Sequence, residues 1–197
     1  MIYASSMKFC SECGTGVELK VPVGDHLPRH VCPQCGTIHY INPKVIVGCV
    51  PEWEDRILMC KRAIEPRLGR WTFPAGFLEL GETSGQGAAR EALEEGGCEV
   101  EIAELFVVIS VPYVSQVYMI HRARMKTDRF HPTVESSEVV LMREPEIPWD
   151  EIAFPTIYHS LKFFFADRAS GHRGVHTLDL TVRPRRPQDA EVSGAPV

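Results

Sequence analysis

The chain has 197 residues, with a hydrophobic fraction of 44% and a charged fraction of 24%, values that are ordinary for a soluble globular protein. The length predicts one domain with a smaller appendage and excludes wholesale disorder, because enough chain is present to bury a core. The formal net charge of −5 argues against a broad basic surface. We therefore do not expect nucleic acid as a partner.

The opening residues, MIYASSMKFC, lack the basic segment and apolar core of a secretory signal. The chain also contains no run of about 18 apolar residues, so we expect no membrane span. We predict a cytoplasmic protein. In that reducing compartment structural disulfides are rare, and cysteines serve as metal ligands, nucleophiles or small core residues.

Four of the seven cysteines form two CxxC pairs that 18 residues separate. Two thiolates on each tight turn would grip one face of a tetrahedral ion, and this spacing is typical of a structural Zn²⁺ site. Free thiols and two redox-active pairs are the alternatives, although a redox motif needs no matched partner. We predict a zinc ribbon over residues 8–41, with four ligands: Cys10, Cys13, Cys32 and Cys35.

The other three cysteines show no such pattern, and we expect them to be small core residues. They are Cys49, Cys60 and Cys98.

After the predicted ribbon, KVIVGCV and RILMCKR have the pattern of a β-hairpin. Further strand-like tracts are EVEIAELFVVISV, SQVYMIHRARM and EVVLM, and apolar residues at helical spacing predict a helix over 156–168. This order fits a mixed sheet between helices. We assign residues 42–170 to this domain and residues 171–197 to a C-terminal extension that is mobile at least from 183.

Residues 76–98, GFLELGETSGQGAAREALEEGGC, join a glycine-rich loop to an acidic segment. Thr83 and Gln86 have the spacing of a capping box, and two glycines end the segment, so we predict a helix of about three turns. Three glutamates of this helix, at positions 91, 94 and 95, fall within a wedge of about 100°. Ala89, Ala92 and Leu93 lie on the opposite side, which we expect to face the core. A solvated acidic face is the alternative. Carboxylates so close repel one another, but together they offer the hard oxygen ligands that Mg²⁺ prefers.

The skeleton of this stretch is Gly76-x5-Glu82-x7-Arg90-Glu91-x2-Glu94-Glu95-x-Gly97. It resembles the Nudix box, the signature of hydrolases that cleave nucleoside diphosphates linked to another group. Ala92 and Cys98 depart from that signature, because the family usually has bulkier aliphatic residues there.

The resemblance implies an α/β fold of the Nudix type, an α/β/α sandwich with a mixed sheet. It also implies Mg²⁺ or Mn²⁺ at the acidic helix, with four ligands: Glu91, Glu94, Glu95 and the carbonyl of Gly76. An ion pair between Glu82 and Arg90 would orient the glutamates, and Glu94 and Glu95 would also take part in catalysis.

The general base stays open, because relatives use either a glutamate of the box or one from a later loop. Glu138, in the acidic segment VESSEV, is our first candidate, with Glu135 behind it. A plain surface glutamate is the alternative.

The residues that contact the substrate can be predicted only from their chemical type. Candidate base-stacking groups are aromatic, although such residues in strands are often core, and candidate phosphate contacts are arginines, although surface salt bridges are equally typical. They are Phe77, Tyr113, Tyr118, Arg62 and Arg70.

Beyond the box, CSECG, CPQCG, IHYINPKVIVGCVPEWEDRILMCKRAIEPR, WTFPAGFLELGET and EIPWDEIAF resemble plant plastid Nudix hydrolases and their bacterial relatives. That group implies FAD cleaved to FMN and AMP, or ADP-ribose cleaved to AMP and ribose 5-phosphate. Relatives are commonly homodimers, so we expect a homodimer, with the ribbon as one candidate interface. The partner molecule would be a small nucleotide.

Two alternatives stay open. One is the zinc-ribbon NADH pyrophosphatase group, which also removes NAD caps from RNA; its motif SQPWPFPxS is not found here, where the nearest segment is PYVSQVYMI. The other is a Nudix domain that senses nucleotides without catalysis.

Overall fold

The computed structural model describes residues 7–183, and the chain divides into two compact units, one that ends at Pro43 and one that begins at Lys44. The first unit has a three-stranded antiparallel sheet in the order β1-β2-β3. Its strands are β1 (Glu18–Lys20), β2 (Arg29–Val31) and β3 (Ile38–His39). Apolar side chains such as Leu19 and Val23 are exposed, so burial contributes little to the stability of this unit.

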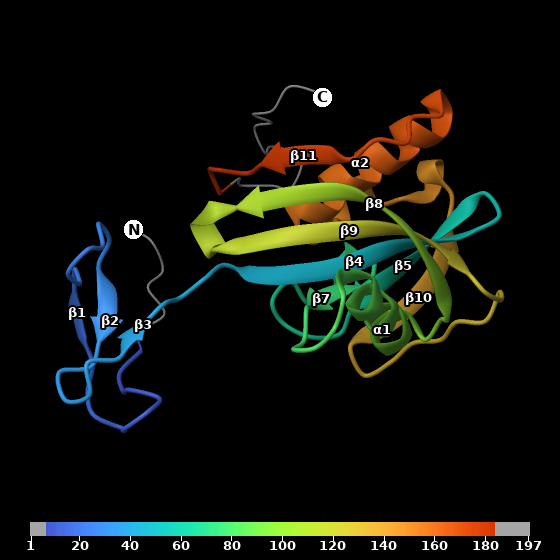
Figure 1. The fold of residues 1–197 in the computed structure, drawn as a ribbon. Coiled ribbons are helices and arrows are strands. Elements are labelled where there is room, and N and C mark those ends of the chain that lie inside the picture. Colours follow the sequence, from blue (N-terminus) through green and yellow to red (C-terminus); the bar gives the residue numbers. More distant parts are fainter. Residues whose placement is uncertain (1–6, 184–197) are drawn as a thin grey trace. The chain divides into compact units, whose positions relative to one another are not determined.

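The second unit is built on an eight-stranded mixed sheet (Figure 1). Its main path runs β10-β5-β4-β9-β8-β11, with β6 beside β5 and β7 beside β4. The pairs β4–β9 and β8–β11 are parallel, and the remaining pairs are antiparallel. The strands are β4 (Lys44–Trp53), β5 (Arg56–Arg62), β6 (Trp71–Thr72), β7 (Ala75–Phe77), β8 (Val100–Val111), β9 (Gln116–Met125), β10 (Ser136–Met142) and β11 (His176–Asp179).

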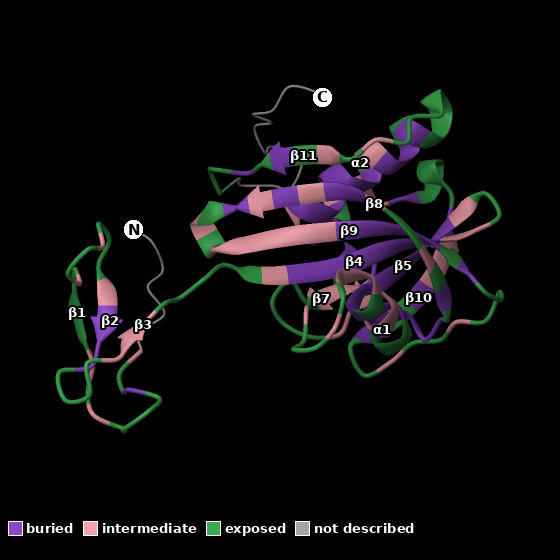
Figure 2. Cartoon of the chain, in the orientation of Figure 1, coloured by how far each residue is buried: buried purple, intermediate pink, exposed green. Residues whose placement is uncertain are grey.

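Two α-helices of the described residues, α1 (Ser84–Gly96) and α2 (Pro155–Ser170), cover the sheet. Side chains of a strand alternate between its two faces, and here each face has its own core. Ile57 and Met59 of β5 pack in the core that includes α2, whereas Leu58 and Cys60 pack in the core that includes α1. This alternation produces the predicted α/β/α sandwich and buries the central strands (Figure 2).

Short 3₁₀ helices link these elements: η1 (Pro112–Val114), η2 (Glu144–Glu146) and η3 (Trp149–Glu151). None of the helices within residues 7–183 combines the length and apolar character needed to cross a membrane. The three cysteines that we expected in the core, Cys49, Cys60 and Cys98, are all buried.

The last strand of the sheet has no counterpart among the predicted elements, and neither do the short strands β6 and β7. Residues 176–179 form β11, which extends the sheet beside β8, and Leu178 and Leu180 are buried in the core of α2. The four residues HTLD are too few for a strand pattern to stand out. The first part of the C-terminal extension is therefore structured, and the mobile tail predicted from residue 183 lies, after that residue, outside the described residues.

The sheet opens where β4 leaves β5 and pairs with β7, and this junction depends on Gly48. A Cβ atom at Gly48 would lie 2.5 Å from the Cβ of Ala75 and 2.6 Å from the carbonyl oxygen of Pro74. Neither atom can move aside easily, because the carbonyl oxygen belongs to the backbone and the Cβ of Ala75 is bonded directly to it. Glycine therefore lets β7 come close enough to deliver the following loop to α1.

We expect Gly48→Ala to lower the free energy of unfolding by about 1–3 kcal/mol, because the added methyl group must push two strands apart. Gly85→Ala is the matched control, since its Cβ would meet only Ile102 at an ordinary 3.5 Å. In a helix this control should be neutral or stabilising by up to about 1 kcal/mol. Urea unfolding of both variants measures the difference, and equal stabilities would refute the explanation.

Candidate active site

Helix α1 begins and ends where the sequence predicts. The Thr83 hydroxyl accepts from the backbone N–H of Gln86, and the Gln86 side chain accepts from the backbone N–H of Thr83. At the other end Gly97 has a left-handed conformation, with φ of 58°, and its N–H is bonded to carbonyl groups of the last turn. The capping box and the glycine end are thus confirmed, and they fix which residues of α1 face the sheet.

The orientation of α1 differs from our expectation. Leu93, predicted to face the core, is 53% exposed, whereas Glu91 and Glu95 are buried. Ala88 and Ala92 pack against the sheet, and Glu91 and Glu95 each follow one of them by three positions, so all four share one face. Small alanines bring the helix close to the sheet, and β7 then covers the two carboxylates.

Gly76 of β7 lies directly over the Glu91 carboxylate. A Cβ atom at Gly76 would lie 2.3 Å from Glu91 Oε1 and 2.5 Å from Oε2. No other residue fits there without moving the carboxylate. The predicted pair of Gly76 and Glu91 is therefore brought together, with the peptide of Gly76 beside the acidic group.

Arg90 connects the acidic side chains to one another. Its guanidinium donates to Glu82 Oε1 and Oε2 at 2.8 and 3.2 Å, to Glu91 at 2.8 Å and to Glu94 at 2.8 Å. It also donates to the carbonyl oxygen of Phe77 at 2.9 Å. These bonds raise the pKa of Arg90, and the hydrogen bonds that Glu82 accepts from Arg90 and from the Glu79 N–H lower the pKa of Glu82. The predicted ion pair of Glu82 and Arg90 is present, and it extends to two further glutamates.

Glu95 is the most perturbed carboxylate of the site. It accepts from the backbone N–H of Ala75 at 2.9 Å, but burial raises its pKa to about 7. Burial also raises the pKa of Glu91, although Arg90 acts in the opposite direction. Buried carboxylates that resist ionisation are suited to receive a divalent cation, because the cation supplies the missing charge.

A cavity of about 610 Å³ opens over these carboxylates. It collects most of the predicted site residues: Gly76, Arg90, Glu91, Glu94, Glu95, Arg62, Phe77, Tyr113 and Tyr118. Phe154, Thr156, Gln116 and Arg183 also line it, although no motif pointed to them. Phe154 was detectable only through its place in EIPWDEIAF, and its ring lies under the Arg62 guanidinium at 5.3 Å.

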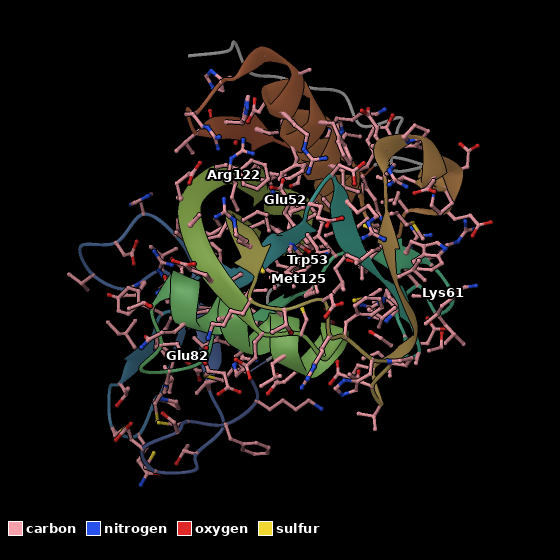
Figure 3. All side chains as sticks on the ribbon, turned by 90° about the vertical axis from the view of Figure 1, so that its right-hand side faces the viewer. Glu52, Trp53, Lys61, Glu82, Arg122 and Met125 are labelled. Atoms are coloured by element: carbon pink, nitrogen blue, oxygen red, sulfur yellow. The ribbon has the colours of Figure 1, made fainter. Side chains whose placement is uncertain are left out.

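Three predicted residues do not line this cavity, and one of them is Glu82, which instead pairs with Arg90. Arg70 donates to the carbonyl oxygen of Asp150 at 3.1 Å instead of lining the cavity. Glu138 lies in β10, where its carboxylate is 3.4 Å from Lys61 Nζ, and the cavity is lined by Glu135 instead. Figure 3 labels Lys61 far from Glu82. Of the two candidate bases, Glu135 thus lies at the cavity and Glu138 does not, and the role of either residue stays a prediction.

The first unit holds the four predicted cysteine ligands in one cluster. The Sγ–Sγ distances are 3.7 Å for Cys10–Cys35, 3.5 Å for Cys13–Cys32 and 3.7 Å for Cys13–Cys35. Four sulfurs at about 2.3 Å from a tetrahedral Zn²⁺ would be about 3.8 Å apart, so this cluster has the dimensions of such a site.

The two cysteine turns have the same backbone structure. In each, a glycine with φ near 70° follows the second cysteine and donates to the carbonyl oxygen of the first, at 3.0 Å. Bonds from Thr37 also lower the pKa of Cys35 to about 6, which favours the thiolate that binds a metal.

The structure thus defines an α/β/α sandwich that presents an acidic helix to a cavity, together with a four-cysteine unit. Residues 42–161 match the family described as NUDIX domain, and residues 8–41 match the one described as Nudix N-terminal, a zinc ribbon. The chain belongs to the Nudix family.

Individual relatives agree with this assignment. A solved NUDIX hydrolase from Nitrosomonas europaea is 55% identical, with a TM-score of 0.87, over 89% of this chain and 100% of that one. A "NAD-capped RNA hydrolase NudC" of Photobacterium profundum is 31% identical over 73% of this chain and 52% of its own length. An "ADP-ribose pyrophosphatase" of Methanocaldococcus jannaschii is 37% identical over 37% of this chain and 43% of its own length. The chain spans about half the length of the curated relatives it matches.

The raised pKa of Glu95 predicts a pH-dependent stability. The metal-free folded protein holds this proton more tightly than the unfolded chain, whose pKa is near 4.5. The resulting stabilisation is complete below about pH 4.5 and is lost as the pH rises through about 7. At about pH 8 we expect Glu95→Gln to be more stable than wild type by on the order of 3 kcal/mol, and near pH 4.5 to be equal to it.

Urea unfolding at each pH measures this difference, with Mg²⁺ omitted rather than chelated so that the cysteine site is left intact. Glu94→Gln is the control, because the Glu94 side chain is 53% exposed and should give little pH-dependent gain. A Glu95→Gln profile parallel to that of wild type would show that Glu95 ionises normally.

Proposed function

We propose that this protein hydrolyses the pyrophosphate bond of a nucleoside diphosphate derivative. The observation that carries the proposal is the set of buried glutamates beneath a cavity large enough for a nucleotide. Glu91, Glu94, Glu95 and the Gly76 carbonyl would hold Mg²⁺ or Mn²⁺. When bound, the ion would supply positive charge at the pyrophosphate and would lower the pKa of a water molecule.

The chain's own residues would position the reactants. Arg62, which lines the cavity, would meet the phosphates, and Glu82 would hold Arg90 in place beside the glutamates. A water molecule attacks one phosphorus and the bridging P–O bond breaks, so that each product carries one phosphate. A general base takes the proton from the attacking water.

For the general base we propose Glu135 ahead of Glu138. Glu135 lines the cavity with the acidic residues of α1, whereas Glu138 is paired with Lys61 outside it. The backbone also supports this choice, because the Glu135 carbonyl accepts from the N–H of Ala63, which anchors the segment beside β5.

The substrate we favour is FAD or ADP-ribose. Phe77, Tyr113, Tyr118 and Phe154 offer flat apolar surfaces beside Arg62, a combination suited to a base and its phosphates. The second candidate is NADH or NAD-capped RNA, which the names of several curated relatives favour. Our expectation that the protein does not bind nucleic acid is therefore unsupported by these relatives. A nucleotide sensor without catalysis is the third candidate.

We further propose that Zn²⁺ occupies the four-cysteine cluster and has a structural role. The homodimer, the assignment of residues 42–170 to one domain and the cytoplasmic location stay predictions from the sequence.

A substrate screen tests the proposal. We expect purified full-length protein with Mg²⁺ to cleave FAD or ADP-ribose to AMP and the matching phosphate, identified by chromatography and mass spectrometry. NADH and NAD-capped RNA are the parallel substrates, and faster cleavage of either would select the second candidate. Tight binding without cleavage of any of the four would favour the sensor, and Glu95→Gln controls for a contaminating activity.

Paired glutamine variants test the base. We expect Glu135→Gln to lower kcat by about 10²–10³-fold, because the amide cannot accept the proton of the attacking water. Glu138→Gln is matched in chemistry and lies in the same segment, and it should stay within about twofold of wild type, since an exposed ion pair with Lys61 contributes little. The reverse pattern would return the role to Glu138.

A further inference from the structure

A second group of metal-ligating side chains lies at the end of α2. Asp167, His172 and His176 each place one ligand atom within 4.8 Å of the others. Asp167 comes from α2, His172 from the following loop and His176 from the start of β11. This group has no part in the site described above, and the cavity beside it shares no lining residue with the cavity over α1.

We propose that these three residues bind a divalent transition-metal ion of the Zn²⁺ type. Two imidazoles and one carboxylate form a ligand set of intermediate softness, which suits Zn²⁺ and related ions. Mg²⁺ prefers oxygen ligands alone, so the acidic helix and this group differ in the ions they would take. Three protein ligands leave at least one coordination position for water or for a further ligand.

The carboxylate of the site is buried and already oriented. The Asp167 side chain is 3% exposed, and its Oδ1 lies 2.8 Å from His176 Nε2. Its other oxygen, Oδ2, accepts from the Arg122 guanidinium. Arg122 thus occupies one oxygen and leaves Oδ1 directed at the histidines, as the outer partners of metal-binding carboxylates do. In Figure 3, Arg122 is labelled near α2, whereas Glu82 is labelled beside α1.

Both imidazoles have defined surroundings. The His176 ring stacks on Phe163, with centroids 4.3 Å apart and planes inclined by 6°, and the His172 ring lies 5.0 Å from that of His176. Gly174 leaves room for His172, because a Cβ atom there would lie 2.6 Å from His172 Nε2. The loop therefore holds the second imidazole close to the first.

A modest rotation would complete the site. Ligands of Zn²⁺ lie about 2.0–2.2 Å from the ion, so neighbouring ligand atoms are about 3.3 Å apart in a tetrahedron. Asp167 Oδ1 and His176 Nε2 are at a hydrogen-bond distance of 2.8 Å, so they need to separate only slightly to bind one ion. His172 is exposed, so its ring can close the remaining gap without leaving a core. The adjacent cavity of about 450 Å³ includes Glu104, whose carboxylate lies 3.4 Å from Arg122 Nε and offsets the charge of that arginine.

The ion would fasten β11 to the sheet. This strand is the last in the sheet and lies beside β8 alone within the described residues. A metal bound by residues 167, 172 and 176 would connect the end of α2 to the start of β11, and because the three ligands come together only in the folded chain, binding would stabilise the folded state. Zn²⁺ would then stabilise the catalytic unit independently of the four-cysteine unit.

Counting bound zinc tests the proposal. Full-length protein is equilibrated with excess Zn²⁺ in the presence of several millimolar Mg²⁺, which occupies the acidic helix, and free metal is then removed. Mass spectrometry of the metal should give two Zn²⁺ per wild-type chain and one per chain of His172→Ala or His176→Gln. His131→Ala, which removes an exposed imidazole elsewhere, should retain two.

Two further readouts separate metal binding from damage to the fold. Without added Zn²⁺, His172→Ala should have the Tm of wild type, because the side chain is exposed. With Zn²⁺, the Tm of the wild type should rise and that of His172→Ala should not, and the ring NMR signals of His172 and His176 should shift with Zn²⁺ but not with Mg²⁺. One Zn²⁺ per wild-type chain, or equal counts in wild type and His172→Ala, would overturn the proposal.

Discussion

The site depends on one guanidinium that balances several carboxylates. Two unit charges about 4 Å apart interact by about 4 kcal/mol near a protein surface, so glutamates that cluster without a counter-charge oppose folding. Arg90 contacts Glu82, Glu91 and Glu94 and also the Phe77 carbonyl. The arginine therefore does more than neutralise charge: it ties α1 to the strand β7 that covers it, and so fixes the distance between the helix and the cavity.

Helix α1 can lie this close to β7 and to the rest of the sheet only because small residues occupy the contact on both α1 and β7. Besides Gly76, a Cβ atom at Gly87 would lie 2.8 Å from Val47, and one at Gly96 would lie 2.6 Å from Leu58. Ala88 and Ala92 complete the face of α1 against the sheet. The smaller residue at position 92, a departure from the usual Nudix box, fits this close contact. Packing and charge thus require one another, because a helix held farther away would expose the glutamates and lose the perturbed pKa of Glu95.

Sequence reasoning succeeded where structure is determined locally. The capping box, the glycine end of α1 and the two cysteine turns each depend on residues a few positions apart. It failed where the position of a side chain depends on segments that are distant in the sequence and pack against it. The exposure of Leu93 follows from the cover that β7 places over the glutamates. The position of Glu138 away from the cavity follows from β10, which begins already at Ser136. Arg70 likewise was judged by residue type alone, and its partner comes from a segment 80 residues away.

A proton on Glu95 and the guanidinium of Arg90 balance the negative charge of the glutamates on α1. Burial raises the pKa of Glu95 to about 7, so this carboxylate keeps part of its proton at neutral pH, while Glu91 and Glu94 share one nitrogen of Arg90. A divalent ion at the same carboxylates would displace that proton and compete with that nitrogen. Glu82 does not take part in this competition, because its two oxygens accept from the other two nitrogens of Arg90, Nε and Nη2. Arg90 would therefore keep Glu82 as a partner if the glutamates of α1 turned to another cation.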